Sequence, residues 1–387
     1  MGYLDSLYGW WNPPPLVEKL SHTKEAMRAR NITLATTPNS VSPLGGGIPS
    51  RFHHGMGVGF LGARVTAHNR LPQEYELLLT VCSLVHDWGN PPFAHLGERF
   101  LKKVTGKDGE SFLAEILDGS ESERILREYG LSVAQVVRFV TGDEKPLSEV
   151  LNGSLDIDNL DNVLRVNAAA RLGAPWFDAA VIASSFRFLN GRWTLLDRCW
   201  KETKQWQRSR AIVYGTIYGA MHLSVSMMIY RAVELAFFEG NLTKSFFFLD
   251  DHQALQCLLD KANPRTVALV DAALRWNWFE EIVRMQWNNI PSGLISFPDE
   301  VERRWRLAQM LCHTFQIPNQ HLAVYTGKGR AKRRITIPFI ATDGTVRFDQ
   351  SDESADYQVC VYTAKEFTPR RQAIARFLKE FLSLEHQ

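Results

Sequence analysis

The apolar residues of this chain recur mostly at intervals of three and four from about residue 52 to residue 287. The stretches EYELLLTVCSLV, SVAQVVRFV and LDNVLRVNAAARLG show the pattern clearly. Because one turn of an α-helix takes about 3.6 residues, this spacing puts the apolar side chains of each stretch on one face of a helix. A long succession of such faces predicts a bundle of packed α-helices.

The pattern changes near residue 290. The segment HLAVYTGKGRAKRRITIPFIATDGTVRF alternates apolar and polar residues, and YQVCVYTA follows it. Alternation with Thr-Gly-Lys-Gly and Asp-Gly turn signals is typical of β-strands, whereas RRQAIARFLKEFLSLEH closes the chain as an amphipathic helix. We therefore predict a mainly α fold with a smaller C-terminal α+β region. Its predicted parts are an N-terminal segment packing on the core (1–50), a catalytic helical core (51–290) and an α+β lobe (291–387).

Composition excludes several classes of protein. The 387 residues include 44 basic and 42 acidic ones, so the overall charge does not favour nucleic acid or an anionic membrane. The five cysteines are dispersed without a CxxC pair, which argues against a disulfide framework or a thiolate zinc site and favours a reducing cytoplasm. The basic run at 327–334 is consistent with a solvated hairpin tip, or with weak binding of nucleic acid or an anionic effector.

One segment has the length of a membrane span. Residues 211–230, AIVYGTIYGAMHLSVSMMIY, carry no formal charge. The segment nevertheless contains a histidine, three tyrosines and two serines, and it continues into an amphipathic stretch. We predict a buried central helix and no membrane partner.

The stretch VHDWGNPPFAHLGE, residues 85–98, concentrates histidines and carboxylates. Its double proline lacks amide donors, so the preceding helix must end before it, with His86 and Asp87 at that end. A second helix after the break would place His95 and Glu98, three residues apart, on one face. The two pairs would then face a common elbow.

A divalent metal ion is the economical reason for such a cluster. Imidazole and carboxylate groups suit borderline to hard cations, and they are costly in an apolar core without a partner. The motif RFHHGMGV supplies His54 as a further candidate ligand. The motif SLDIDNLDNVLR supplies Asp156, Asp158 and Asp161.

These motifs resemble those of the HD-domain phosphohydrolases. RFHHGMGV is similar to R-F-x-H-S-x-G-V, HDWGNPPFAHLGE to H-D-x-G-[HN]-P-P-F-G-H-x-G-E, and DIDNLD to D-x-D-R-x-D. In this order they resemble the deoxynucleoside triphosphate triphosphohydrolases, the dGTPase branch. The similarity covers about residues 49–173, with a looser likeness in the C-terminal strands and helix, including VYTAKEFTPRR.

The resemblance implies a reaction and roles for individual residues. The reaction is hydrolysis of a deoxynucleoside triphosphate to the deoxynucleoside and inorganic triphosphate, with Mn, Mg, Fe or a similar divalent ion. His95, paired with Glu98, would be the acid/base element, and Arg51 would contact the phosphates. The implied metal ligands are His54, His86, Asp87 and Asp158, and weaker candidates for substrate binding are Arg165, Arg210 and Tyr218.

The chain also departs from the family pattern. Gly55 replaces the usual serine, and Asn159 and Asn162 stand where many members have a basic residue and a tyrosine that touch the substrate, so base preference stays open. The resemblance further implies a homo-oligomer and a nucleotide effector. Two alternatives remain: an HD-type nucleotide phosphatase or phosphodiesterase, and a nucleic-acid-binding regulatory scaffold without turnover.

Overall fold

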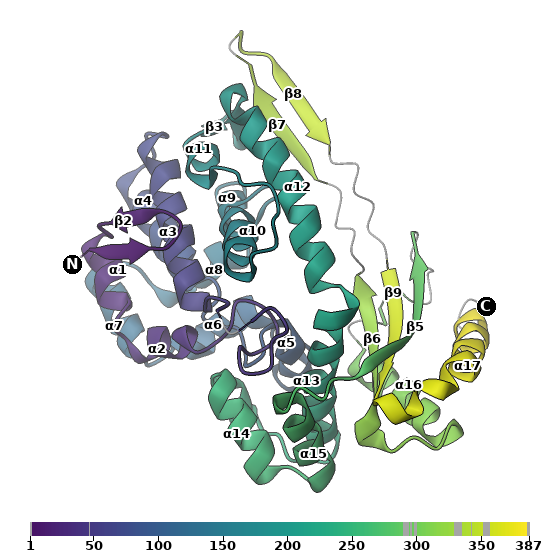
Figure 1. Cartoon of the computed structure of the whole chain (residues 1–387). Helices are drawn as coiled ribbons and strands as arrows, with labels where there is room; N and C mark the ends of the chain where they lie inside the picture. Colours follow the sequence, from purple (N-terminus) through teal and green to yellow (C-terminus); the bar gives the residue numbers. More distant parts are fainter. Residues whose placement is uncertain are drawn as a thin grey trace.

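The computed structural model describes residues 2–45, 47–288, 294, 296–297, 300–328, 335–341, 343–350 and 357–384. Helices dominate it, and three small sheets lie at the N-terminus, beside the helical core and in the C-terminal part (Figure 1). The predicted fold class, mainly α with a smaller α+β region, is confirmed.

The N-terminal segment is a hairpin followed by two short helices. Its elements are β1 (Tyr3–Asp5), β2 (Gly9–Trp11), α1 (Pro15–Leu20) and α2 (Lys24–Arg30). Gly9 adopts φ +74° where the hairpin returns, a conformation that glycine accepts without steric cost. Buried side chains of α1 and α2 belong to the same hydrophobic cluster as those of the next two helices. The two short helices therefore share one hydrophobic cluster with the helical core, and the predicted boundary at residue 50 stays a prediction.

The helical core follows from residue 51. Its helices are α3 (Arg51–Ala67), α4 (Gln73–Val85), α5 (His95–Thr105), α6 (Gly109–Leu117), α7 (Glu121–Glu128), α8 (Val133–Val140), α9 (Glu149–Asn152), α10 (Ile157–Ala170), α11 (Ala179–Ala183), α12 (Trp200–Ile217), α13 (Ala220–Phe238), α14 (Asp251–Lys261) and α15 (Pro264–Leu274). Side-chain caps fix the starts of helices α3 and α10. Ser50 accepts from the His53 amide at the start of α3, and Asp156 accepts from the Asn159 amide at the start of α10.

The strands form two further sheets. Strands β3 (Phe186–Leu189) and β4 (Arg192–Leu196) make a hairpin, and β7 (Thr336–Ile340) adds to β4 in parallel, with β8 (Val346–Gln350) at the edge. The other sheet has the order β5 (Glu280–Trp287), β9 (Tyr357–Thr363), β6 (Leu322–Lys328), all antiparallel. Helices α16 (Val301–Thr314) and α17 (Arg371–Leu384) pack on it (Figure 1). The predicted division at residue 290 stays a prediction, and β5 pairs across it with β9.

The charge-free segment 211–230 is not one helix, which corrects the sequence prediction. It is divided between α12 and α13, which break at Tyr218 and Gly219 and are bent by 52°. Among the described residues no single helix is long and apolar enough to span a membrane, although this bent pair passes the same test of length and composition. Most of α13 is buried within the protein, which agrees with its predicted place in the core.

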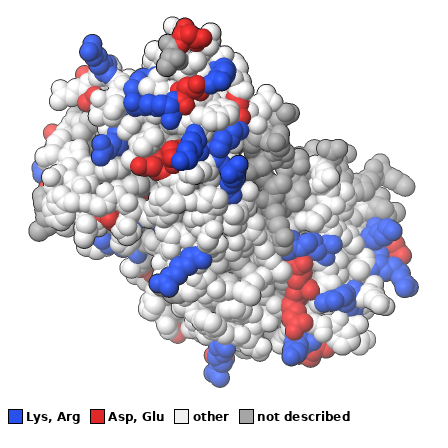
Figure 2. Space-filling view, turned by 45° about the horizontal axis from the view of Figure 1, so that its top comes forward, with Lys and Arg blue, Asp and Glu red and all other residues white. Residues whose placement is uncertain are grey.

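One face of the molecule carries charges of both signs (Figure 2). On the face shown in Figure 2, basic and acidic side chains lie interspersed, in keeping with the nearly balanced composition. Residues 329–334 of the basic run lie outside the described residues, so its predicted hairpin tip stays a prediction.

Candidate metal centre

The four predicted metal ligands lie side by side. His54 is in the first turn of α3, His86 caps the C-terminus of α4 with Asp87 after it, and Asp158 is in the first turn of α10. His54 Nε2 lies 2.8 Å from Asp158 Oδ1 and 3.7 Å from Asp87 Oδ2. His86 Nε2 lies 3.5 Å from Asp87 Oδ2 and 3.7 Å from Asp158 Oδ1. The structure therefore brings together groups as far apart in the sequence as His54 and Asp158, which are separated by 104 positions.

The remaining ring nitrogens of both histidines face fixed acceptors. His86 Nδ1 lies 2.9 Å from the carbonyl oxygen of Ser83, and His54 Nδ1 lies 2.7 Å from Asp161 Oδ2. A carbonyl or carboxylate oxygen can only accept, so each Nδ1 carries a proton and Nε2 is the nitrogen that points into the cluster. Asp161, the last carboxylate of the motif SLDIDNLDNVLR, therefore orients His54.

Charge around the site favours ionised carboxylates. Burial raises the pKa of Asp87, but the charges of Arg51, His86 and His54 outweigh burial and hold it well below its ordinary value. Burial likewise raises the pKa of Asp158, yet the hydrogen bond to His54 and the charges of both histidines keep that pKa well below the usual range. Both side chains therefore offer charged oxygen atoms at neutral pH.

The residues fit a divalent cation. His86 Nε2 is buried and has no hydrogen-bond partner among the described residues, an arrangement that costs free energy unless a ligand is bound there. Ligand atoms of His54, His86 and Asp87 all lie within 4.8 Å of one another, so this group can hold a metal ion. Asp158 adds an oxygen at the same place. Imidazole nitrogens with carboxylate oxygens suit Mn, Fe, Mg or similar ions.

Arg51 reaches the cluster from the start of α3. Its Nη1 lies 2.5 Å from Asp87 Oδ2, and Asn90 Nδ2 donates to Asp87 Oδ1 at 2.6 Å. Burial lowers the pKa of Arg51, but the Asp87 carboxylate outweighs burial, and the net effect raises this pKa above its ordinary value. The guanidinium therefore stays charged. The predicted phosphate-binding arginine is thus beside the candidate metal ligands, and its role stays a prediction.

His95 and Glu98 form the pair that their spacing predicts. His95 is the first residue of α5, and its Nδ1 lies 2.7 Å from Glu98 Oε2. The His95 side chain is 64% exposed, so its Nε2 is open to a ligand, whereas Glu98 is 26% exposed. Burial raises the pKa of Glu98, but the His95 charge and hydrogen bond lower it below its ordinary value. An ionised Glu98 therefore holds His95 with a proton on Nδ1.

The elbow, the turn formed by residues 86–94 between α4 and α5, is held by side chains from distant parts of the chain. Arg28 donates to the carbonyl oxygens of Trp88 (2.8 Å) and Asn90 (2.7 Å). Phe93 has φ of 62°, a strained value for a non-glycine residue, and its amide donates to Asp251 Oδ1 at 2.8 Å. Sequence reasoning missed Arg28 and Asp251, because neither lies in a motif and only the fold brings them to the elbow.

The position of Arg165 does not match its predicted contact with substrate phosphates. Its side chain is only 2% exposed, and its Nε and Nη2 each lie 2.8 Å from an oxygen of Asp161. Nη2 also donates to Asp5 Oδ2 at 3.0 Å. Arg165 therefore sits behind His54, where it fixes Asp161.

The other substrate candidates are Arg210 on α12 and Tyr218, which caps its C-terminus. The rings of Tyr214 and Tyr218 stack with centroids 6.2 Å apart, and the Arg210 guanidinium lies 5.7 Å from the Tyr214 ring. Asn159, which follows Asp158, donates to the Tyr214 hydroxyl at 3.0 Å. Tyr214 thus joins α12 to the metal centre. In the sequence, only its spacing of four residues from Tyr218 indicates that the two rings share a helical face. The predicted roles of Arg210 and Tyr218 stay predictions.

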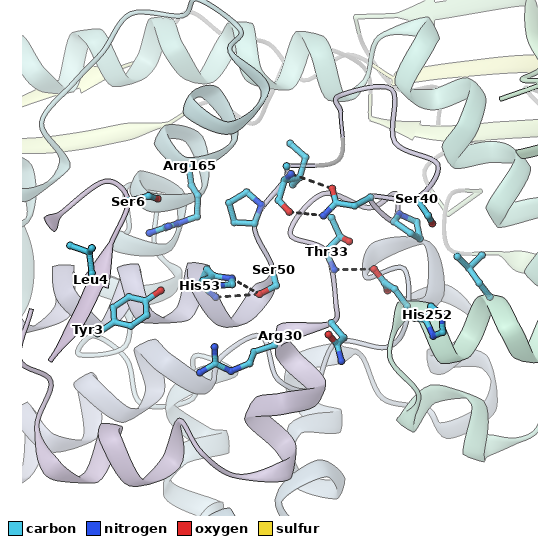
Figure 3. A pocket seen from close by; sticks show the side chains of 18 residues that line it. Tyr3, Leu4, Ser6, Arg30, Thr33, Ser40, Ser50, His53, Arg165 and His252 are labelled. Atoms are coloured by element: carbon cyan, nitrogen blue, oxygen red, sulfur yellow. Dashed lines mark hydrogen bonds between the residues drawn. The ribbon is translucent and has the colours of Figure 1, made fainter. Parts of the chain in front are cut away.

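A cavity of about 660 Å³ lies next to the centre, beside the start of α3. Figure 3 shows His53, bonded to Ser50, together with Arg165 and residues of the N-terminal hairpin along its wall. His53 lines this cavity, whereas His54 faces the metal cluster. The assignment of His54 as the candidate ligand, with His53 at the variable position, agrees with this geometry.

Comparison with known proteins supports the fold. No family model matches the chain, and a search of curated proteins finds no match. Among solved structures, a phosphohydrolase from Bacteroides thetaiotaomicron has a TM-score of 0.70 at 17% identity, over 94% of this chain and 99% of that one. A hypothetical protein from Aquifex aeolicus has a TM-score of 0.70 at 16% identity, over 96% and 99%. At these identities the likeness shows a shared fold.

Proposed function

We propose that this chain is a metal-dependent phosphohydrolase that cleaves deoxynucleoside triphosphates into the deoxynucleoside and inorganic triphosphate. The observation that carries the proposal is the convergence of His54, His86, Asp87 and Asp158, with both Nε2 atoms turned towards two ionised carboxylates. The three ordered sequence motifs and the fold shared with a phosphohydrolase support it.

A divalent ion held by these four residues would supply Lewis-acid polarisation of a phosphoryl oxygen. Arg51 contributes a buried positive charge next to Asp87, where its planar guanidinium suits the oxygens of a phosphate chain. The protein thereby concentrates positive charge where the substrate is most negative.

His95 supplies the proton transfer. Glu98 fixes the His95 Nδ1 proton, so the exposed Nε2 is the atom that gives a proton to the departing nucleoside oxygen or accepts one from water. Both residues lie on α5, and the bond from the Phe93 amide to Asp251 anchors the chain two residues before His95.

The C-terminal end of α12 offers a candidate wall for the nucleoside. Tyr214, which stacks on Tyr218, is bonded to Asn159 beside the centre, and tyrosine rings suit the planar face of a base and the apolar face of a sugar. We extend the proposal to a cytoplasmic homo-oligomer under nucleotide control, on the strength of the motif resemblance.

A product-resolved assay tests the proposal. The purified chain is incubated with Mn²⁺ or Mg²⁺ and each deoxynucleoside triphosphate, and the products are separated by ion-exchange chromatography. Release of inorganic triphosphate with an equal amount of deoxynucleoside is expected, and His95→Gln should abolish it. His68→Gln is the matched control, since His68 follows the far end of α3, about 21 Å from His54 at the helical rise of about 1.5 Å per residue. Orthophosphate or pyrophosphate as the product would refute the reaction.

The same assay separates the alternatives. A phosphatase or phosphodiesterase would turn over monophosphates or cyclic nucleotides and would release no inorganic triphosphate. A binding scaffold would keep its biological activity in His95→Ala and Asp158→Ala and lose it on neutralising residues 327–334.

A further inference from the structure

The N-terminal hairpin is joined to the metal centre by one side chain. Asp5 ends β1 and is 4% exposed. Its Oδ1 accepts from the amides of Leu7 (2.8 Å) and Tyr8 (3.2 Å), which shapes the turn. Its Oδ2 accepts from Arg165 Nη2 at 3.0 Å. The two oxygens thus have separate tasks, one inside the hairpin and one towards the core.

The contact continues inward through alternating charges. Arg165 grips both oxygens of Asp161 at 2.8 Å, and Asp161 Oδ2 lies 2.7 Å from His54 Nδ1. Asp5, Arg165, Asp161 and His54 are all buried. The carboxylate that orients His54 is therefore held in place by an arginine that Asp5 also contacts.

The packing leaves this chain of contacts little freedom. A Cβ atom added to Gly57 in α3 would lie 2.1 Å from Asp161 Oδ1 and 2.2 Å from Arg165 Nη2. The ion pair therefore passes against the bare backbone of α3, one turn after His54. The Arg165 guanidinium also faces the Tyr8 ring of the hairpin at 5.9 Å, so the hairpin contacts it twice. Figure 3 shows Arg165 next to the hairpin residues Leu4 and Ser6.

We propose that Asp5 is a positioning residue of the metal centre, which orients the His54 imidazole through Arg165 and Asp161. The inference rests on the proposed metal site and extends it to a segment outside every motif. Asp5 bonds one terminal nitrogen of Arg165, which keeps the guanidinium in the plane where it meets Asp161 with two bonds. Without that contact the fork can rotate, and Asp161 no longer fixes the direction of His54 Nε2.

The test is a direct measurement of Mn²⁺ affinity on the full chain, by calorimetry and by the electron paramagnetic resonance spectrum of the bound ion. Asp5→Asn keeps an oxygen for the Leu7 and Tyr8 amides, so the hairpin turn is retained while the acceptor for Arg165 is lost. We expect affinity to fall about tenfold, the lower end of the effect of outer-shell substitutions, with an altered spectrum. Asp5→Ser, whose hydroxyl can also accept from the turn, is the second variant if Asp5→Asn does not fold.

Two controls separate positioning from loosening of the hairpin. Gly9→Ala strains the turn at φ +74° without touching Arg165, and Asp271→Asn removes an exposed aspartate paired with Arg275 on α15. Both should bind Mn²⁺ as the wild type does. If Asp5→Asn bound Mn²⁺ with wild-type affinity, or if Gly9→Ala lost as much affinity as Asp5→Asn, the role of Asp5 would be refuted while the proposed metal centre would stand. A wild-type chain that takes up no Mn²⁺ would overturn the metal centre with it.

Discussion

Replacing Arg165 with methionine should destabilise the whole protein. Methionine keeps the length and apolar stem of the side chain but leaves Asp161 and Asp5 as buried carboxylates without their cation. Three hydrogen bonds to charged groups disappear, with nitrogen to oxygen distances of 2.8, 2.8 and 3.0 Å. Breaking a buried ion pair by removing one partner costs about 3–5 kcal/mol. The free energy of unfolding of an ordinary domain is about 5–15 kcal/mol, so this loss is a large fraction of the total stability.

Urea denaturation followed by far-ultraviolet circular dichroism measures this cost. Arg138→Met is the matched control, because the Arg138 side chain is 62% exposed and pairs with Glu144 at the surface. Such a pair contributes about 0–1 kcal/mol. If Arg165→Met lost less than about 1 kcal/mol of unfolding free energy while kcat/KM for nucleotide collapsed, Arg165 would be a substrate contact, and the orienting role would be wrong.

Three more substitutions give separate tests. Gly57→Ala should cost about 1–3 kcal/mol, because its Cβ would collide with Asp161 and Arg165; Gly215→Ala in α12, where a Cβ meets open space, should instead stabilise by up to about 1 kcal/mol in denaturation. Glu98→Gln should lower kcat about 100-fold with little change in KM, since the amide oxygen still accepts from His95 but lacks the carboxylate charge beside the proton-transferring imidazole; an unchanged kcat would exclude the pair from proton transfer. Burial raises the pKa of Asp251 from its ordinary value of 3.8 to about 6, so the folded state binds this proton more tightly than the unfolded state does. Wild-type stability should therefore fall as pH rises from about 4 to about 6, by at most about 3 kcal/mol from this group, and Asp251→Asn should flatten that fall; parallel curves for the two proteins would contradict the assignment.

The sequence predicts local features of the site well. The double proline in VHDWGNPPFAHLGE requires a helix end, and α4 indeed ends at Val85 with His86 as its cap. The three-residue spacing of His95 and Glu98 on a helix fixes their contact whatever the surroundings. Such features depend on neighbouring residues alone, so periodicity and turn chemistry are sufficient to predict them.

Features that depend on distant packing were not predictable in this way. Arg165 carries the same charge whether it binds a phosphate or a buried carboxylate, and only the fold places Asp5 and Asp161 around it. The charge-free segment 211–230 looks like one helix, because apolar composition does not register the break at Gly219 that redirects α13. Arg28 and Asp251 hold the elbow through backbone groups, which leave no side-chain pattern in the sequence.

The location of a bound ion tests the central claim most directly. A crystal of the chain grown with Mn²⁺ can be measured at the manganese absorption edge, where anomalous scattering marks the ion without reference to the surrounding atoms. We predict a single strong peak at about 2.0–2.4 Å from His54 Nε2, His86 Nε2 and oxygens of Asp87 and Asp158. A peak elsewhere, or no peak between these four side chains at saturating Mn²⁺, would contradict the account.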